Sequence, residues 1–251
     1  MSALAPLRWS NLKNMGRSAA HYKYYLDNPI AETDAMRVGS RAHDLVLAGG
    51  SNRFAVWDGG RRAGKDWAAF EADHADVTIL TSDQEIRAKA IAEAVKSDAT
   101  AMAALFGCVT ETRREWLIAG RECCGTPDAV GPSSIVDLKV TRDGSPGKFP
   151  WHARRMGWLG QLAWYDYGLF VGNATNLSII AVEDLAPHIV TVYRLTPDAA
   201  EMGHRIWRSH FERLRVCEDA DVWPGYSEAV VPLEVDQEFS LHSGHEEMTS
   251  D

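Results

Sequence analysis

The chain has 251 residues, of which 45% are hydrophobic and 24% are charged. This composition is ordinary for a soluble globular protein, and the length is sufficient for one substantial core. No apolar run approaches the length that spans a bilayer, and the amino terminus lacks a charged segment followed by a long hydrophobic stretch. These features argue against a membrane or secreted protein, so we expect a cytoplasmic one.

The net charge of −9 is concentrated near the carboxyl end. Residues 201–251 contain four Lys and Arg against twelve Asp and Glu, whereas residues 1–200 contain 22 against 23. The body is therefore nearly neutral, and any binding of a polyanion would depend on a local basic patch. We expect a single domain over residues 1–217, followed by an acidic, partly disordered extension over residues 218–251.

Helices and strands are expected to alternate along the chain. In order, they are helices 10–26 and 33–49, strand 53–57, helices 64–75 and 83–105, strands 108–118, 121–130 and 134–140, helix 149–170, strands 176–184 and 188–195, and helix 197–216. Ser10 and Thr33 are the expected N-caps of the first two helices. The three central strands read as a meander, and the whole order predicts an α/β fold with a mixed central sheet flanked by helices.

The strand around Asp137 carries an acid and a lysine within otherwise apolar text, Ser134-Ile135-Val136-Asp137-Leu138-Lys139-Val140. Asp137 and Lys139 should point to the same face, because residues two apart on a strand do so. A carboxylate can bind Mg²⁺, which prefers oxygen ligands, and an ammonium beside it can assist a water and offset charge on a phosphate. Most such pairs are nevertheless solvated faces or surface ion pairs, so further residues are needed.

Two further features accompany this strand. Asp128 lies on the preceding strand, and a short turn at residues 131–133 should pair the two strands and bring Asp128 close to Asp137. On the following helix, Gln161 and Tyr165 are four residues apart and share one face. A tyrosine at this spacing is often part of a core instead.

Together, Asp128, Asp137-x-Lys139 and Gln161-x-x-x-Tyr165 resemble the PD-(D/E)xK nuclease superfamily, in the branch of RecE-type exodeoxyribonuclease VIII, YqaJ-type viral recombinases and lambda exonuclease. The amino-terminal half is similar to the opening of RecE-type domains, in which a serine-led helix precedes a Gly-x-x-x-His helix, here Gly39 to His43. The resemblance covers roughly residues 7–215. It implies a restriction-endonuclease-like core. Thr126-Pro127 departs from the branch, which often has a basic residue there.

The resemblance also implies roles for individual residues. The implied metal ligands are His43, Asp128, Asp137 and the Leu138 carbonyl, with Mg²⁺ as cofactor and Mn²⁺ as a substitute. The implied catalytic residues are Asp128, Asp137, Lys139, Glu111, Gln161 and Tyr165. Glu115 competes with Glu111 for the role of additional acid, and both could be solvated strand carboxylates.

Basic residues interleaved with aromatic ones follow the Asp-x-Lys strand. This pattern suits a groove for DNA, in which charges meet phosphates and rings meet bases. The candidate DNA-binding residues are Arg142, Lys148, Arg154, Arg155 and Trp158. The four cysteines lack the closely spaced carboxyl-terminal trio that holds an iron–sulfur cluster in some relatives, so we expect reduced thiols and no cluster.

By resemblance, the expected activity is Mg²⁺-dependent exonucleolytic degradation of linear double-stranded DNA, 5′ to 3′, leaving a 3′ single strand for phage-type recombination. The implied partners are DNA ends, a single-strand annealing recombinase and further copies of the chain in a trimeric or tetrameric ring. The implied setting is a bacterial host, with a phage or prophage gene. Two alternatives remain open: a structure- or sequence-specific endonuclease, and a non-catalytic DNA-binding or recombinase-loading subunit.

Overall fold

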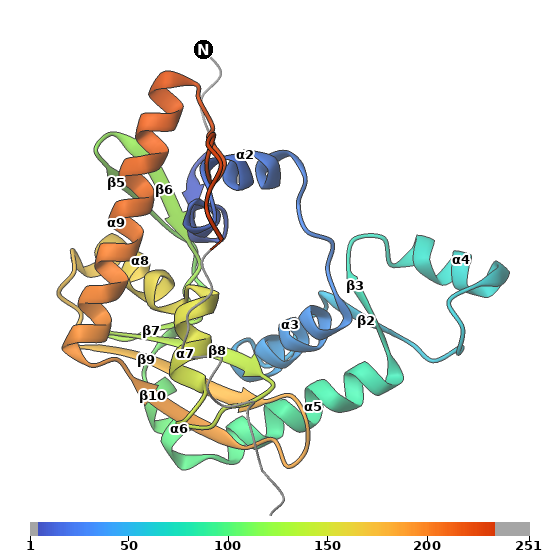
Figure 1. The fold of residues 1–251 in the computed structure, drawn as a ribbon. Coiled ribbons are helices and arrows are strands. Elements are labelled where there is room, and N and C mark those ends of the chain that lie inside the picture. Colours follow the sequence, from blue (N-terminus) through green and yellow to red (C-terminus); the bar gives the residue numbers. More distant parts are fainter. Residues whose placement is uncertain (1–4, 234–251) are drawn as a thin grey trace, which may run out of the picture.

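The computed structural model describes residues 5–233. Its central sheet has five strands in the order β10-β9-β8-β7-β4. These are β4 (Val109–Thr110), β7 (Ala129–Val130), β8 (Ser134–Thr141), β9 (Asn176–Glu183) and β10 (Val190–Arg194). Strands β8 and β9 are parallel, and the other neighbours are antiparallel. The predicted mixed α/β fold is confirmed (Figure 1).

Helices cover both faces of this sheet (Figure 1). Alternate residues of β9 point to opposite faces, so that Ile179 joins the core beneath α8 and α9 while Ile180 joins the core beneath α3 and α5. The covering helices are α3 (Asp34–Leu47), α5 (Ser82–Ser97), α6 (Ala99–Leu105), α8 (Trp158–Phe170) and α9 (Pro197–Ala220). Trp164 of α8 is fully buried in the first of these cores. Burial of a large apolar side chain stabilises the folded state by about 1.5–3 kcal/mol.

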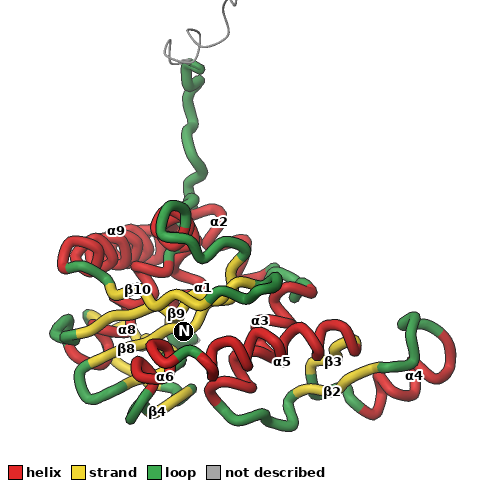
Figure 2. Tube along the Cα trace, turned by 90° about the horizontal axis from the view of Figure 1, so that it is seen from below, coloured by secondary structure: helices red, strands yellow, loops and turns green. Residues whose placement is uncertain are grey.

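Two smaller sheets flank the central one. The three-stranded sheet has the order β1-β6-β5, with β1 (Leu7–Arg8), β5 (Arg114–Ile118) and β6 (Arg121–Gly125). The two-stranded sheet pairs β2 (Phe54–Trp57) with β3 (Thr78–Thr81), and α4 (Gly64–Asp73) lies between them in the sequence. Residues 54–81, termed the arm, project sideways from α3 and α5 (Figures 1 and 2). Strands β1 and β3 were not predicted.

Three predicted helices are divided in the structure. The helix expected over residues 10–26 consists of α1 (Trp9–Leu12), a 3₁₀ turn η1 (Lys13–Gly16) and α2 (Ala19–Asp27). Ser10 lies inside α1, so its predicted role as N-cap is wrong, and Ser18 instead caps α2 by accepting the His21 N–H. Asp98 ends α5 and caps α6. Gly157, at φ 77°, separates α7 (Phe149–Met156) from α8, because this left-handed conformation ends a helix.

Two predicted strands are also divided, and the predicted meander is therefore wrong. Strands β4 and β5 belong to different sheets, as do β6 and β7. The chain leaves β4 at Glu111, which has a φ of 45°. It leaves β6 before Pro127, which lacks the N–H that a strand ladder requires. Both breaks lie next to Asp128. Pro127 precedes it in the chain, and the Glu111 N–H donates to its carbonyl at 3.0 Å.

The first described part of the acidic extension packs against the body. Helix α9 continues to Ala220, and the Trp223 ring lies parallel to that of Tyr22 with centroids 5.8 Å apart. The Ala20 N–H donates to the Pro224 carbonyl at 3.1 Å. Residues 234–251 of the predicted extension lie outside the described residues.

All four cysteines are free thiols, as expected. Within residues 5–233, no helix is both long and apolar enough to cross a membrane.

The left-handed backbone at Glu111 generates a stability prediction. Glu111→Ala and Glu111→Gly both remove the carboxylate, but only glycine adopts a φ of 45° without steric strain. We expect Glu111→Gly to be more stable than Glu111→Ala by about 1 kcal/mol, measured by urea unfolding. Equal stability of the two variants would show that the backbone at this position relaxes without cost.

His210 generates a prediction about pH. Its ring lies parallel to Trp9, its Nδ1 is buried with no hydrogen-bond partner in the described chain, and burial together with Arg213 lowers its pKa from 6.5 to about 4. Between pH 6.5 and about 4, the unfolded chain therefore binds a proton at this histidine, whereas the folded chain does not. The free energy of unfolding therefore decreases as the pH falls through this window. His210→Phe cannot titrate. Comparing urea unfolding of the two proteins across the window, we expect the wild type to lose more stability; parallel curves would contradict this.

Candidate active site

The hairpin formed by β7 and β8 brings two acids together. Ala129 pairs with Val136, so the next positions along the ladder are Asp128 and Asp137. Asp128 Oδ2 accepts the Leu138 N–H at 2.7 Å, which fixes its carboxylate against β8. The predicted approach of the two strands is confirmed. Burial raises the pKa of Asp128, although the Lys139 charge and this hydrogen bond oppose the effect.

Asp137 and Lys139 form a buried ion pair on one face of β8. Lys139 Nζ lies 2.6 Å from Asp137 Oδ2, and the Asp137 side chain is 1% exposed. Asp137 Oδ1 has no hydrogen-bond partner within residues 5–233. Burial raises the pKa of Asp137 to about 6. Burial alone would lower the pKa of Lys139, but Asp137 and Asp128 outweigh it and the pKa is raised.

His43 reaches these acids from α3. Its Nδ1 lies 3.6 Å from Asp128 Oδ2, too long for a hydrogen bond but within ion-pair range. Burial, followed by the effect of the Lys139 ammonium, lowers the pKa of His43 to about 4. The imidazole is therefore neutral at pH 7 and retains a lone pair for a cation.

The structure separates the two acids that the sequence left open. Glu111 carries a charge that acts on His43 and Asp128, and its Oε2 lies 3.1 Å from Nη2 of Arg53. Glu115 lies on β5 and forms an exposed ion pair with Arg113 at 2.8 Å. Of the two, Glu111 is the one placed beside the acids of the hairpin.

Gln161 and Tyr165 face Lys139 from α8, across a pocket of about 380 Å³. Gln161 Nε2 donates to the Tyr165 hydroxyl at 3.3 Å, as expected for residues four apart on one helix face. Burial raises the pKa of Tyr165 above its ordinary value, so the phenol stays protonated. Gly125 allows this arrangement, because a Cβ there would lie only 2.4 Å from the Tyr165 ring. We call this cavity the inner pocket.

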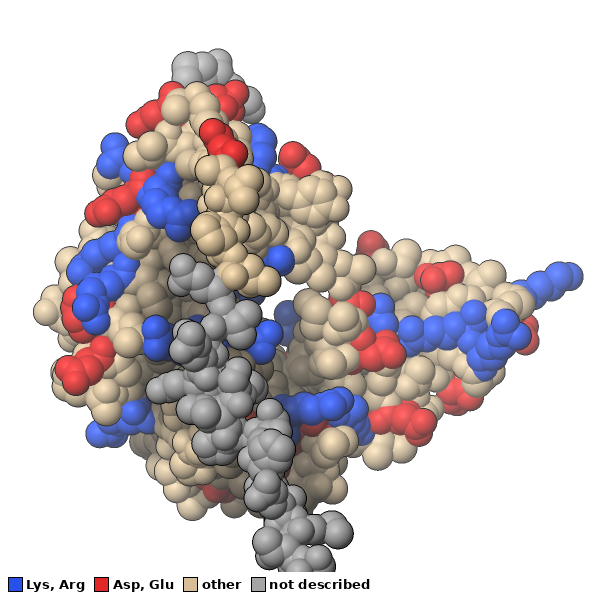
Figure 3. Space-filling model, in the orientation of Figure 1, with Lys and Arg blue, Asp and Glu red and all other residues tan. Residues whose placement is uncertain are grey.

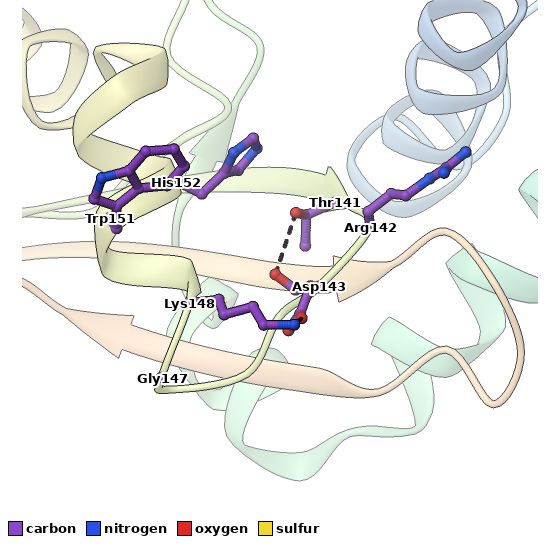
Figure 4. A pocket seen from close by; sticks show the side chains of 7 residues that line it. All are labelled: Thr141, Arg142, Asp143, Gly147, Lys148, Trp151 and His152. Carbon is purple, nitrogen blue, oxygen red and sulfur yellow. Dashed lines mark hydrogen bonds and ion pairs between the residues drawn. The ribbon is translucent and has the colours of Figure 1, made fainter. Parts of the chain in front are cut away.

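The five residues predicted to bind DNA lie at different places. Arg142 and Lys148 line a separate cavity of about 310 Å³ beyond the end of β8, in which Lys148 Nζ lies 2.9 Å from Asp143 and Arg142 points away from that pair (Figure 4). Trp158 lines the inner pocket, 5.7 Å from Lys139 Nζ to the ring centroid. Arg154 and Arg155 line a third cavity, beside α7 and η1. The five residues do not form one patch.

Several basic residues near the site were missed by the sequence reasoning. Arg8, Lys13 and Arg113 line the inner pocket with Lys139, and Arg17 lines the neighbouring cavity. One signal was available: Lys13 and Arg17 are four apart and follow Trp9, a spacing that places cations on one side of a helical segment. The apolar pattern instead predicts one continuous helix over residues 10–26.

The residues present match the donor types that Mg²⁺ prefers. Asp137 Oδ1 is a buried carboxylate oxygen with no partner in the described chain, Asp128 lies beside it, and both are oxygen donors suited to a hard cation. Within residues 5–233, no three His, Cys, Asp or Glu side chains are grouped as a metal site would group them. The fit therefore depends on the two carboxylates, with His43 nearby.

Comparisons with known proteins bear on the fold and the family of the chain. A protein of Eubacterium rectale, provisionally named an exonuclease, has a similar crystal structure, with a TM-score of 0.64, 15% identity, and coverage of 94% of this chain and 93% of its own. This likeness shows the fold alone.

An alkaline exonuclease of Laribacter hongkongensis covers 87% of this chain and 92% of its own at 14% identity, with a TM-score of 0.34 that is too low to support an argument. No curated protein matches the sequence. Residues 9–232 match the family described as "PDDEXK-like domain of unknown function (DUF3799)". The chain therefore belongs to this PDDEXK-like family, which places it in the PD-(D/E)xK nuclease superfamily that its motifs predicted.

Proposed function

We propose that the chain is a metal-dependent exonuclease that hydrolyses linear double-stranded DNA from its ends, 5′ to 3′. The observation that carries the proposal is the buried Asp137, whose Oδ1 is unpartnered in the described chain although Lys139 and Asp128 lie beside it. The name of the Eubacterium rectale neighbour supports an exonuclease over an endonuclease. By resemblance, the 3′ single strand would pass to an annealing recombinase, and copies of the chain would form a ring.

Asp128, Asp137 and the Leu138 carbonyl would hold Mg²⁺, or Mn²⁺ in its place, with His43 as a further ligand. When bound, the ion would offset negative charge on the scissile phosphate and make a water more acidic. Hydrolysis joins the water oxygen to phosphorus, breaks the bond to the leaving oxygen, and requires that this oxygen receive a proton.

The chain's own groups would act on the phosphate as follows. Asp137 and Asp128 hold Lys139 protonated, so its ammonium donates hydrogen bonds to phosphate oxygens and offsets their charge. Gln161 and the protonated Tyr165 supply uncharged donors on the opposite wall of the inner pocket. Neutral His43 adds no positive charge that would repel a cation.

Asp137→Asn should slow cleavage strongly while leaving the shape of the site intact. We expect the wild type with Mg²⁺ to release label from the 5′ end of linear duplex DNA, and the variant to be slower by about a hundredfold or more. Asp83→Asn, an exposed Asp on α5, is the matched control and should cleave normally. Cleavage of a closed circle would indicate an endonuclease, and intact DNA in every lane would favour the non-catalytic alternative.

Metal binding has a readout that is independent of cleavage. Calorimetric titration of the wild type and of Asp83→Asn with Mn²⁺ should give heat of binding. In a separate thermal melt, Mn²⁺ should raise the unfolding temperature of both proteins, because a ligand that binds the native state stabilises it. Asp137→Asn should give neither. An unchanged titration for Asp137→Asn would remove Asp137 from the metal site.

A further inference from the structure

An arginine at the root of the arm joins three segments of the chain. Arg53 immediately precedes β2, and its backbone carbonyl accepts the Thr78 N–H at 2.9 Å, which closes the base of the arm. Its Nε donates to Ser51 Oγ at 3.0 Å. Its Nη2 donates both to Asp44 Oδ1 at 3.2 Å and to Glu111 Oε2 at 3.1 Å. The arm, α3 and the segment after β4 therefore meet at one guanidinium.

An ion pair by itself would not distinguish this arginine. Lys and Arg side chains are interspersed with Asp and Glu on the face drawn in Figure 3, and an exposed pair of this kind adds little to stability. The Arg53 side chain is 58% exposed, but Asp44, to which it is bonded, is fully buried. The guanidinium is thus held from the interior of the protein although it lies at the surface.

The anchor at Asp44 does not depend on Arg53. The Asp44 carboxylate also accepts the O–H and the N–H of Ser51, and Arg41 Nη1 donates to it at 2.8 Å. These bonds remain when the Arg53 guanidinium is removed, so α3 and its His43 should stay in place. The group that loses its support is Glu111.

The Glu111 carboxylate has little else to fix its direction. Among residues 5–233, Arg53 is its one hydrogen-bond partner. The side chain is 28% exposed, and the backbone there has the φ of 45° that ends the strand. Its charge nevertheless acts on both His43 and Asp128. The direction of this carboxylate therefore matters for any cation held beside those two residues.

We propose that Arg53 is a positioning residue for the metal site, which holds the Glu111 carboxylate toward His43 and Asp128, where its negative charge favours the cation. This inference rests on the proposed function for the presence of the metal. Arg53 itself touches neither the metal nor the DNA. The planar guanidinium suits this role because it donates in fixed directions, to Asp44 on one side and to Glu111 on the other, which a lysine ammonium cannot do.

A double-mutant cycle on metal binding tests the proposal. Mn²⁺ is titrated calorimetrically into the wild type, Arg53→Gln, Glu111→Gln and the double variant. Arg53→Gln should weaken binding by about tenfold, the usual effect of losing a group that orients a metal site. The double variant should bind no more weakly than Glu111→Gln alone, because Arg53 acts through Glu111. Arg53→Lys keeps the charge without the planar fork and should resemble Arg53→Gln.

Arg37→Gln is the matched control. Arg37 also bridges two acids, Glu32 and Asp34, at the start of α3, and Asp34 is 76% exposed. This variant should bind Mn²⁺ as the wild type does, and a thermal melt without metal should show that it and Arg53→Gln are equally folded. A tenfold loss in Arg37→Gln as well would overturn the proposal, because the effect would then not be specific to Arg53.

Other outcomes of the cycle would also overturn the proposal. Tighter binding by Arg53→Gln would show that the guanidinium acts only by repelling the cation. An additive loss in the double variant would show that Arg53 does not act through Glu111. Wild-type binding by Arg53→Lys would assign the effect to charge alone, and a wild type that binds no Mn²⁺ would leave Arg53 no metal site to support.

Cleavage kinetics separate positioning from direct contact with DNA. In an active protein, Arg53→Gln should lower kcat and leave the KM for linear duplex DNA unchanged. A raised KM with an unchanged kcat would place Arg53 on the DNA and overturn the proposal. An inactive protein whose metal-binding cycle still couples Arg53 to Glu111 would contradict the proposed function and retain the role of Arg53, whereas an active protein with additive losses would do the reverse.

Discussion

The structure depends on one strand that is buried on both faces and still carries two charges. Val136 and Leu138 of β8 are 1% exposed and face the core beneath α3 and α5, while Asp137 and Lys139 face α8. Burying an isolated charge costs several kcal/mol, so each of these charges needs a partner. Their contact at 2.6 Å meets that need for Lys139 but leaves Asp137 Oδ1 unpartnered in the described chain. Because native proteins rarely leave such an atom unsatisfied, this carboxylate is where the proposed metal ion would be held.

The surrounding elements are shaped to give access to this pair. Gly125 lets the Tyr165 ring pass close to the end of β6, where any side chain would collide with it. Gly157 ends α7 in a left-handed turn, and α8 then begins with Trp158, whose ring lies beside Lys139. Without the turn, α7 and α8 would continue as one helix, and Arg154 and Trp158, four apart, would share one face of it. The break instead places the two residues on different cavities, Trp158 on the inner pocket and Arg154 on the cavity beside η1.

The sequence predicted the parts of the site that depend on short-range geometry. A short turn sets the hairpin register and hence the approach of Asp128 to Asp137, and helical spacing places Gln161 beside Tyr165. The assignment of strands to separate sheets could not be predicted, because it depends on backbone breaks at Glu111 and Pro127 that no apolar pattern marks. The cations that line the inner pocket and the cavity beside η1 could not be predicted for a similar reason, since Lys13 lies in a 3₁₀ turn within a segment whose pattern predicts one continuous helix.

The position of Glu111 shows how far the site depends on distant segments. Arg53, at the base of the arm, lies within 3.2 Å of Asp44 Oδ1 and 3.1 Å of Glu111 Oε2, so a single guanidinium joins the arm, α3 and the segment after β4. Asp44 is fully buried and also accepts hydrogen bonds from Ser51 and Arg41, which fixes the helix turn that carries His43. Glu111 and Glu115 are indistinguishable in the sequence because both are strand-region acids near a basic residue. The fold separates them: Glu111 lies close enough to His43 and Asp128 to act on both and pairs with Arg53, 58 residues earlier in the chain, whereas Glu115 is exposed on β5 and pairs with Arg113.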